Sequence, residues 1–565
     1  MMQENFENPI EAYYEIFTDN PLTEGYKYNF ISPTDFRNFL IKTAKKNNKN
    51  TELMDTSIEN PNFFCPLPRY SFALLTKICV KIGENLKLDN VLGFIPEKEG
   101  IEKKFTKILN KYSNLKEGKF LKEACNRMRI ISGMEKNSFI HNIVTSTIGC
   151  LYPNPVRVQN FVEPVMIEYL QNHVYKSKKS FKNKIKVMPT EGSSSSLILV
   201  LNSLKHNKIL KKEDKIGIIT PICSSYLEIS SLENYNFQNI YIQADQLNNG
   251  YISQTEIEKI GNPKMKVLLL INPSNPTGTS LSSGVIRKIS KIVRVNNPNL
   301  IIIEDNLYSP FIEKFYTFFN SLSKNTIGIF SFSKYFGATG CNLGLIALHN
   351  NNVIDNILLN SYYNSETEDL NKRYLRTVNN KKGNIKFIDK IFADYRQIIK
   401  SNLGGLSTPQ QTMMCLFSMH EILKNKNAYN NNLKNTLINR KKKLLKSIDC
   451  EIIEKNTTNV YVVIDIPKIA DILMGGTNFG DYIRKNEDPF DFIINLAKRY
   501  NTIVLPTVAF AGMFWGIRIC LANLNESSYE KIGKNILFLI DDYYKKFKKW
   551  ETKQIKIDMK EDKTD

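Results

Sequence analysis

Short apolar runs alternate with amphipathic stretches through the middle of the chain, between about residues 187 and 350. Continuous runs of β-branched and other apolar residues predict strands at Ile216–Thr220, Ile240–Ile242, Val267–Ile271, Leu300–Ile303, Ile327–Phe332 and Leu343–Leu348. Between them, apolar residues recur at helical spacing, as in Ser195–His206 and Ser283–Val293. This alternation is typical of crossover units on a mostly parallel sheet with both faces covered.

The flanking segments are mainly helical by the same criterion. Upstream, helices are predicted at Phe6–Phe17, Pro33–Lys46, Ser71–Ile82 and Gly100–Leu109. Downstream, the pattern predicts a long helical region at Pro409–Leu445, strands at Ile452–Asp465, Ile503–Pro506 and Gly516–Leu521, and a helix at Ser528–Lys548. We therefore expect a major α/β domain over residues 151–405. A minor α+β domain over 406–545 would be discontinuous, taking in part of a helical extension at 1–150. A charged tail at 546–565 would follow, frayed over Glu551–Asp565.

Composition places the chain among globular proteins, with 42% hydrophobic and 24% charged residues over 565 positions. No apolar run approaches the ~18 residues needed to cross a bilayer, and the first residues lack a secretory pattern. The nine cysteines form no C-x-x-C pair, which indicates free thiols in a reducing compartment, so we expect a cytoplasmic protein. Five histidines without metal-ligand spacing argue against a metal site.

The net charge of +21 changes this picture little. Nucleic-acid binding would require basic residues clustered on one face, whereas the lysines are scattered, usually beside Asn and Ile. A positive field also attracts phosphate and carboxylate ligands. We therefore expect neither a nucleic acid nor a membrane as partner.

Polar residues follow three of the predicted strands. Lys334 comes just after an apolar strand, where desolvation would lower its pKa and free the amine for a Schiff base, although most lysines are simply solvated. Asp305 ends another apolar strand, with Tyr308 three residues on. A buried carboxylate there needs a cationic partner such as a protonated pyridine nitrogen; the alternative is a strand-end cap.

Two further segments belong to the same edge of the sheet. Asn275 begins the second of two Asn-Pro steps that force extended and turn conformations after a third strand. Gly192, Ser193 and Ser194 precede the predicted helix at Ser195–His206, and a helix N-terminus with free N–H groups and hydroxyls can hold a phosphate. A Gly/Ser run can equally be a linker.

In this order, the phosphate loop, Asn-Pro-Thr-Gly, Asp-x-x-Tyr and Ser-x-Ser-Lys resemble fold-type I pyridoxal-phosphate enzymes of the class I/II aminotransferase group. Other segments resemble the bacterial aspartate beta-decarboxylases (aspartate 4-decarboxylases), which also transaminate aspartate: Asn60–Phe63, Pro68–Arg69, Tyr226–Ile229, Ser333–Gly340, Gly405–Gln411 and Arg518–Leu524. The resemblance runs from about residue 55 to 545. It implies an aminotransferase-like fold, pyridoxal 5'-phosphate as cofactor, a small amino-acid substrate, and a homodimer or larger assembly of dimers.

The resemblance also implies a role for each site residue. Lys334 would form the Schiff base and move the Cα proton, and Asp305 would pair with the pyridinium nitrogen. Tyr308 and Asn275 would bind the 3-oxygen of the ring, and Arg518 would clamp the substrate α-carboxylate as a bidentate fork. The remaining cofactor contacts would come from Gly192, Ser193, Ser194, Ser331 and Ser333.

Departures from the family cluster at this site. Asn342 stands where the family has an arginine for the cofactor phosphate, a loss of about 1.5–3 kcal/mol. Ser57–Glu59 replaces Gly-Arg-Gly, which removes a substrate-facing arginine and adds a negative charge. Thr507–Phe510 replaces a glycine-rich stretch, and Cys223 replaces an aromatic residue. Aspartate beta-decarboxylation with aspartate aminotransferase side activity is the expected function; an enzyme for another amino acid and a non-catalytic oligomeric scaffold are the alternatives.

Overall fold

The computed structural model describes most of the chain. The described residues are 33–47, 52–84, 92–149, 156–232, 234–245, 250–361, 374, 385–399, 405–423, 426–451, 456–476, 478–512 and 514–561. The helix predicted at Phe6–Phe17 lies outside them.

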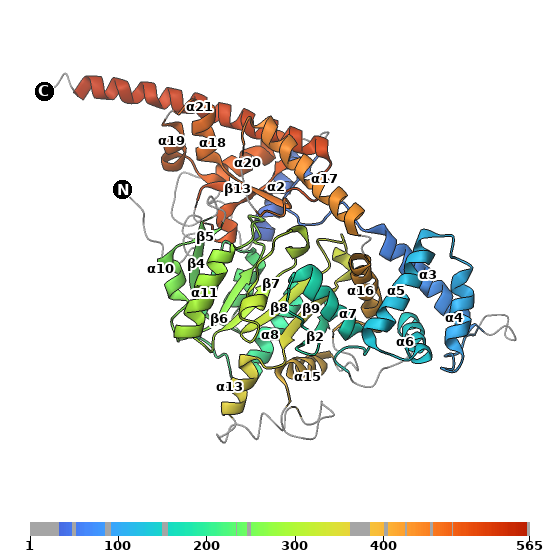
Figure 1. Cartoon of the computed structure of the whole chain (residues 1–565). Coiled ribbons are helices and arrows are strands. Elements are labelled where there is room, and N and C mark those ends of the chain that lie inside the picture. Colours follow the sequence, from blue (N-terminus) through green and yellow to red (C-terminus); the bar gives the residue numbers. More distant parts are fainter. Residues whose placement is uncertain are drawn as a thin grey trace.

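A large sheet forms the centre of the molecule (Figure 1). The described chain contributes eight strands in the order β2-β9-β8-β7-β6-β3-β4-β5. The five strands from β8 to β4 run parallel, whereas β9 is antiparallel to both β8 and β2, and β5 is antiparallel to β4. Their bounds are β2 Ile185–Thr190, β3 Lys215–Thr220, β4 Gln238–Asp245, β5 Tyr251–Ile252, β6 Met265–Ile271, β7 Ile301–Asp305, β8 Thr326–Ser331 and β9 Gly344–His349. The predicted mostly parallel sheet is confirmed.

The apolar strands are continuous because both faces of the sheet are covered. In β6, Val267 and Leu269 belong to one hydrophobic core, while Leu268 and Leu270 belong to a second core on the other face. Helices α10 and α11 contribute to the second core, and α7 and α8 to the first. The helices of this domain are α7 Val162–Tyr169, α8 Ser193–His206, α9 Ser224–Ser231, α10 Gln254–Lys259, α11 Ser283–Asn296, α12 Phe318–Ser321, α13 Val353–Ser361 and α15 Phe387–Ile399, with a π-helical turn at Leu170–Val174.

A group of helices lies beside the sheet domain and forms the helical extension (Figure 1). Helices α3, α5, α6 and α7 surround α16. The helical region predicted at Pro409–Leu445 is therefore two helices with different neighbours, because α16 packs into this group and α17 packs along α21. The bounds are α2 Pro33–Asn47, α3 Pro66–Gly83, α4 Ile101–Asn110, α5 Lys116–Ser132, α6 Lys136–Ile148, α16 Thr408–Ile422 and α17 Lys426–Ser447.

The small domain combines both ends of the chain. Strands β10, β13 and β12 form an antiparallel sheet, β1 pairs with β11, and α2 packs on α20. The predicted discontinuous α+β domain is thus confirmed, while its exact boundaries stay predictions. The bounds are β1 Met54–Asp55, β10 Tyr461–Asp465, β11 Thr502–Ile503, β12 Leu505–Pro506, β13 Gly516–Cys520, α18 Ile466–Leu473, α19 Phe479–Asn486, α20 Pro489–Tyr500 and α21 Glu526–Glu561.

The described part of the charged tail is helical, because α21 continues to Glu561. The Trp550 ring packs 5.2 Å from that of Tyr482 on α19, and within α21 Lys548 Nζ lies 2.8 Å from a Glu551 carboxylate oxygen. The aromatic contact holds this part of α21 against α19, which the charge pattern alone did not indicate. The last four residues lie outside the described residues.

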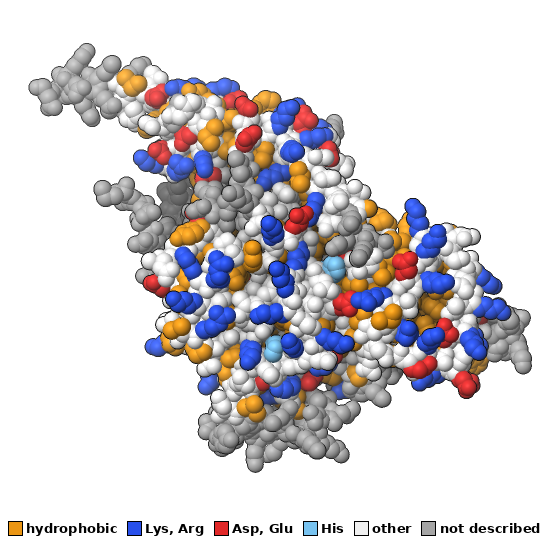
Figure 2. All heavy atoms as spheres, viewed as in Figure 1, with side chains coloured by type: hydrophobic (Ala, Val, Ile, Leu, Met, Phe, Trp, Pro, Cys, Tyr) orange, Lys and Arg blue, Asp and Glu red, His pale blue; other side chains and the backbone are white. Residues whose placement is uncertain are grey.

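Basic residues spread over all three parts of the face shown in Figure 2, with acidic residues among them on the small domain and the helical extension. Within the described residues, no helix combines the length and apolar character needed to cross a membrane. The same residues contain no group of three or more His, Cys, Asp or Glu side chains suited to holding a metal ion.

Candidate active site

The predicted site residues meet where the parallel strands end. Strands β6, β7 and β8 are neighbours in the sheet, and their carboxyl ends lead to Asn275, Asp305 and Lys334 respectively. This edge is where open α/β sheets bind ligands. Arg518 approaches from β13 of the small domain, so the site lies between the two domains.

Asp305 is the last residue of β7 and is fully buried. Its Oδ2 accepts a hydrogen bond from the Tyr226 hydroxyl at 2.5 Å, and its Oδ1 accepts one from the backbone N–H of Leu307 at 3.0 Å. Burial raises the pKa of the Asp305 carboxyl from its ordinary value of 3.8 to about 6, despite these donors. A positively charged group beside Asp305 would therefore stabilise the ionised form of this carboxyl.

The raised pKa predicts how Asp305 affects stability. Well below pH 3.8 the carboxyl is protonated in both states and has no effect, and at pH 4 the effect is still small, but above its folded pKa the charged form destabilises the folded protein by about 3 kcal/mol. We therefore expect Asp305→Asn to stabilise the cofactor-free protein at pH 7.5 and to change little at pH 4. Urea unfolding at both pH values measures this, with the exposed Asp35→Asn as control. An equal effect of Asp305→Asn at both pH values would contradict it.

Lys334 lies on a tightly held loop after β8. Its Nζ donates a hydrogen bond to the Glu59 carbonyl at 2.6 Å. Arg69 donates to the carbonyls of Phe336 and Gly337 at 3.3 and 2.8 Å, and this binding fixes the loop from the side of α3. Gly337 has a φ of +57°, and a Cβ there would lie 1.9 Å from a backbone oxygen. The loop geometry that positions Lys334 thus requires glycine at this place.

Tyr308 and Asn275 face the same point from two loops. The Tyr308 hydroxyl lies 2.5 Å from that of Tyr461 on β10, and Asn275 Nδ2 donates to Glu59 Oε1 at 2.6 Å. The Asn275 loop is closed by Gly278 N–H donating to the Ser274 carbonyl at 2.8 Å.

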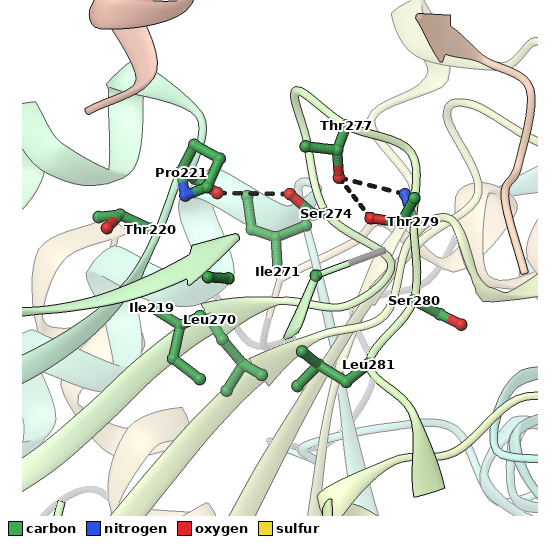
Figure 3. Close-up of a pocket in the computed structure, with 12 residues that line it drawn as sticks. Ile219, Thr220, Pro221, Leu270, Ile271, Ser274, Thr277, Thr279, Ser280 and Leu281 are labelled. Carbon is green, nitrogen blue, oxygen red and sulfur yellow. Dashed lines mark hydrogen bonds between the residues drawn. The ribbon is translucent and has the colours of Figure 1, made fainter. Parts of the chain in front are cut away.

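Figure 3 shows a pocket beneath this loop, at the ends of β3 and β6, where Ser274 Oγ donates to the Pro221 carbonyl at 3.3 Å. None of the proposed catalytic residues lines this pocket. This pocket lies under the loop that carries Asn275 and is separate from the candidate active site.

Arg518 is almost completely buried, with 1% of its surface exposed. Its Nη1 donates to Glu59 Oε1 at 2.7 Å, and its Nη2 donates to the Ser57 carbonyl at 2.6 Å. The guanidinium lies 5.0 Å from the ring centre of Tyr461 and 4.9 Å from that of Phe510. The replacement of the family's glycine-rich stretch therefore places an aromatic ring directly on this cation.

Glu59 is the functional residue whose position the sequence did not predict. Its carboxylate faces Arg518, Asn275 and Lys334. Burial would raise the pKa of this carboxyl, but the nearby ammonium and guanidinium groups outweigh burial and lower the pKa to about 2. The sequence signal for an acid here was the replacement of Gly-Arg-Gly by Ser57–Glu59, but it did not show which way the Glu59 side chain points.

The predicted phosphate loop forms the start of α8. Ser193 Oγ is buried without a hydrogen bond of standard geometry among the described residues, although it lies close enough to Asp305 to lower the pKa of that carboxyl. Ser196 Oγ donates to the Gly192 carbonyl at 2.9 Å. The first N–H groups of this 14-residue helix suit a phosphate. Ser194 is exposed at the same helix end, and Ser331 and Ser333 have their hydroxyls 2.8 Å apart after β8. Asn342, the residue in place of the family's arginine, is exposed with a φ of +49°.

This donor set fits pyridoxal phosphate. The free N–H groups of a helix N-terminus, a buried acid of raised pKa and a lysine after the neighbouring strand are the parts of a two-domain enzyme for amine chemistry. The family model for aminotransferase class I and II matches residues 152–536, and the chain belongs to this family, whose members use pyridoxal phosphate.

Similar proteins agree with this assignment. The chain is 30% identical over 521 residues to a bifunctional aspartate aminotransferase and L-aspartate beta-decarboxylase of Pseudomonas sp., covering 92% of this chain and 97% of the relative. Among solved structures, a single mutant of Thermus thermophilus aspartate aminotransferase matches with a TM-score of 0.56 and 13% identity, covering 92% of this chain and 100% of that one. Thermotoga maritima aspartate aminotransferase matches with a TM-score of 0.55 and 14% identity, covering 90% and 97%. These two structures support the fold.

Proposed function

We propose that this aminotransferase-family enzyme converts aspartate to alanine and carbon dioxide, with aspartate aminotransferase activity alongside. The observation that supports the proposal is the complete set of Lys334, Asp305, Tyr308, Asn275 and Arg518 at one site between two domains. The Pseudomonas relative, which is similar over almost its whole length, carries both activities in its name.

Each residue of the site has a separate role in the proposed reaction. When bound, pyridoxal phosphate supplies an aldehyde that reacts with amines and a ring that accepts electrons from the adjoining carbon. Lys334 supplies the amine that holds the cofactor, and its Nζ then takes and returns the substrate Cα proton. Asp305 holds the proton on the ring nitrogen, and Tyr308 and Asn275 bind the ring oxygen. Arg518 orients the α-carboxylate, while the phosphate is held by Gly192, Ser193, Ser194, Ser331 and Ser333.

The direct test is the reaction of the cofactor-loaded protein with L-aspartate. Alanine and carbon dioxide should appear in equal amounts, and oxaloacetate should form when a 2-oxo acid is supplied as amino acceptor. The same protein without cofactor serves as the blank. If aspartate gives neither product while the cofactor is bound, the proposed reaction is wrong.

A second candidate is the same chemistry on another amino acid, which Glu59 and Phe510 favour. An acid within the pocket opposes a second acidic group on the substrate, and the Phe510 ring occupies space beside Arg518. A panel of neutral and basic amino acids separates this candidate from aspartate. A visible absorption scan with added cofactor tests the remaining alternative, a non-catalytic scaffold, which would show no bound-cofactor band.

We also propose that the chain forms at least a homodimer. Phe64 lies in the segment Asn60–Arg69, which resembles the interface region of the family, and Tyr70 directly follows it; the two side chains are 59% and 64% exposed. Burying these side chains against a second copy would remove apolar surface from water. Sedimentation should therefore give a dimer or a larger even-numbered assembly; a fully active monomer at high dilution would contradict this.

A cytoplasmic location is the accompanying proposal. All the cysteines of the described residues are free thiols, as a reducing compartment would maintain. Cell fractionation tests it, and recovery of the protein outside the cytoplasmic fraction would rule it out.

A further inference from the structure

A carboxylate of the chain itself binds the cation that the proposed function assigns to the substrate. Glu59 Oε1 accepts hydrogen bonds from Arg518 Nη1 at 2.7 Å and from Asn275 Nδ2 at 2.6 Å. Glu59 Oε2 lies 3.4 Å from Lys334 Nζ and 3.4 Å from the Tyr308 hydroxyl. The partners of this carboxylate are thus the same residues that serve the cofactor and the substrate.

We propose that Glu59 is an internal ligand of Arg518, and that a carboxylate substrate binds only by displacing it. The inference rests on the proposed function, in which Arg518 receives the substrate α-carboxylate. Arg518 Nη1 is shared between Glu59 Oε1 at 2.7 Å and Asn275 Oδ1 at 3.4 Å, so a carboxylate that binds Nη1 competes with Glu59. Arg518 Nε is buried without a partner among the described residues, and the Ser57 carbonyl accepts from only one of the two Nη2 hydrogens.

The backbone holds Glu59 in place from both sides. Thr56 N–H donates to the Ile503 carbonyl at 2.9 Å, and Asn62 N–H donates to the Ala522 carbonyl at 2.9 Å. We call residues 56–62 the strap, since hydrogen bonds to the small domain hold both of its ends. The Glu59 side chain is 22% exposed, so it can rotate toward solvent while the strap stays bound.

Charge keeps this internal ligand bound until another anion arrives. Lys334 and Arg518 hold the pKa of the Glu59 carboxyl at about 2, against the effect of burial, so protonation does not release it near neutral pH. The buried guanidinium is stable only with a negative partner, and that partner can be Glu59 or a ligand carboxylate. Selection among substrates is therefore a competition between two carboxylates for one arginine.

The test measures binding of succinate, a carboxylate without a reactive amine, to the full-length cofactor-loaded protein by calorimetry at constant ionic strength. Glu59→Gln should bind succinate about tenfold or more tightly than the wild type, because the charged competitor is gone. Glu52→Gln is the matched control, since Glu52 is exposed upstream of the strap. Equal dissociation constants for wild type and Glu59→Gln would overturn the inference.

Two further variants make the result specific. In an Arg518→Gln background, Glu59→Gln should no longer tighten succinate binding, and a persisting gain would show that Glu59 does not act through Arg518. If Glu59→Gln fails to fold, Glu59→Asp takes its place, because the shorter side chain moves the carboxylate away from Arg518. Glu59→Asp should increase the affinity for succinate by less than tenfold, and an unchanged affinity would overturn the inference. Borohydride labelling of the same samples tests the proposed function separately, because an unlabelled Lys334 would refute that function while leaving the succinate result standing.

Discussion

Replacing Lys334 with alanine is expected to abolish turnover and to release the cofactor from its covalent attachment. The side chain supplies both the amine that binds the aldehyde and the base that moves the Cα proton, so kcat should fall by about 10⁴-fold or more. Borohydride reduction followed by peptide mapping should label Lys334 in the wild type and no residue in the variant.

The exposed Lys324→Ala is the matched control, because Lys324 lies just before β8 on the same stretch of chain and should retain full activity. A label on another lysine, or a Lys334→Ala variant with more than a small residual activity, would show that the amine chemistry is located elsewhere.

Replacing Asp305 with alanine is expected to separate chemistry from cofactor binding. The phosphate contacts at the start of α8 and the amine of Lys334 remain, so the cofactor should still bind, with an absorption band close to that of the wild type. Without the buried negative charge, the ring nitrogen loses its proton and the electron-accepting power of the ring decreases. We expect kcat to fall by about 10²–10³-fold, measured beside the dissociation constant for the cofactor.

Tyr226→Phe is the companion variant, because it removes one hydrogen bond to Asp305 and keeps the charge. Its turnover should fall much less than that of Asp305→Ala. Parallel losses of turnover and cofactor binding in Asp305→Ala would instead make Asp305 a structural cap of β7.

The central sheet was predictable because its strands are buried on both faces. Continuous apolar runs such as Val267–Ile271 distinguish these strands from amphipathic helices. Strand β2 was not predicted, since Lys186 and Pro189 interrupt its apolar pattern; both are tolerated because β2 lies at the edge of the sheet. The extent of α21 was also missed, because contacts of Trp550 with another helix, rather than local composition, continue it.

The main part of the candidate site was also predictable from the positions of the strands. Asn275, Asp305 and Lys334 come after parallel strands, and such strand ends meet at one edge. The pairing of Glu59 with Arg518 could not be predicted, because the two residues are 459 positions apart and meet only where the segment before α3 packs on the small domain. Whether Glu59 faced the pocket or the solvent depended on the path of the strap, which no local pattern encodes.

The strap also restricts how the two domains can move. Besides its bonds to the small domain, it is tied to the sheet domain, since Asn60 Oδ1 accepts from the Thr339 hydroxyl at 2.8 Å and Cys65 N–H, just beyond the strap, donates to the Phe336 carbonyl at 3.1 Å. A hinge rotation that separated the domains would break one set of these bonds. We therefore expect a ligand to enter through rotation of side chains at a nearly constant interdomain angle, and the radius of gyration in solution should be the same with and without a bound carboxylate.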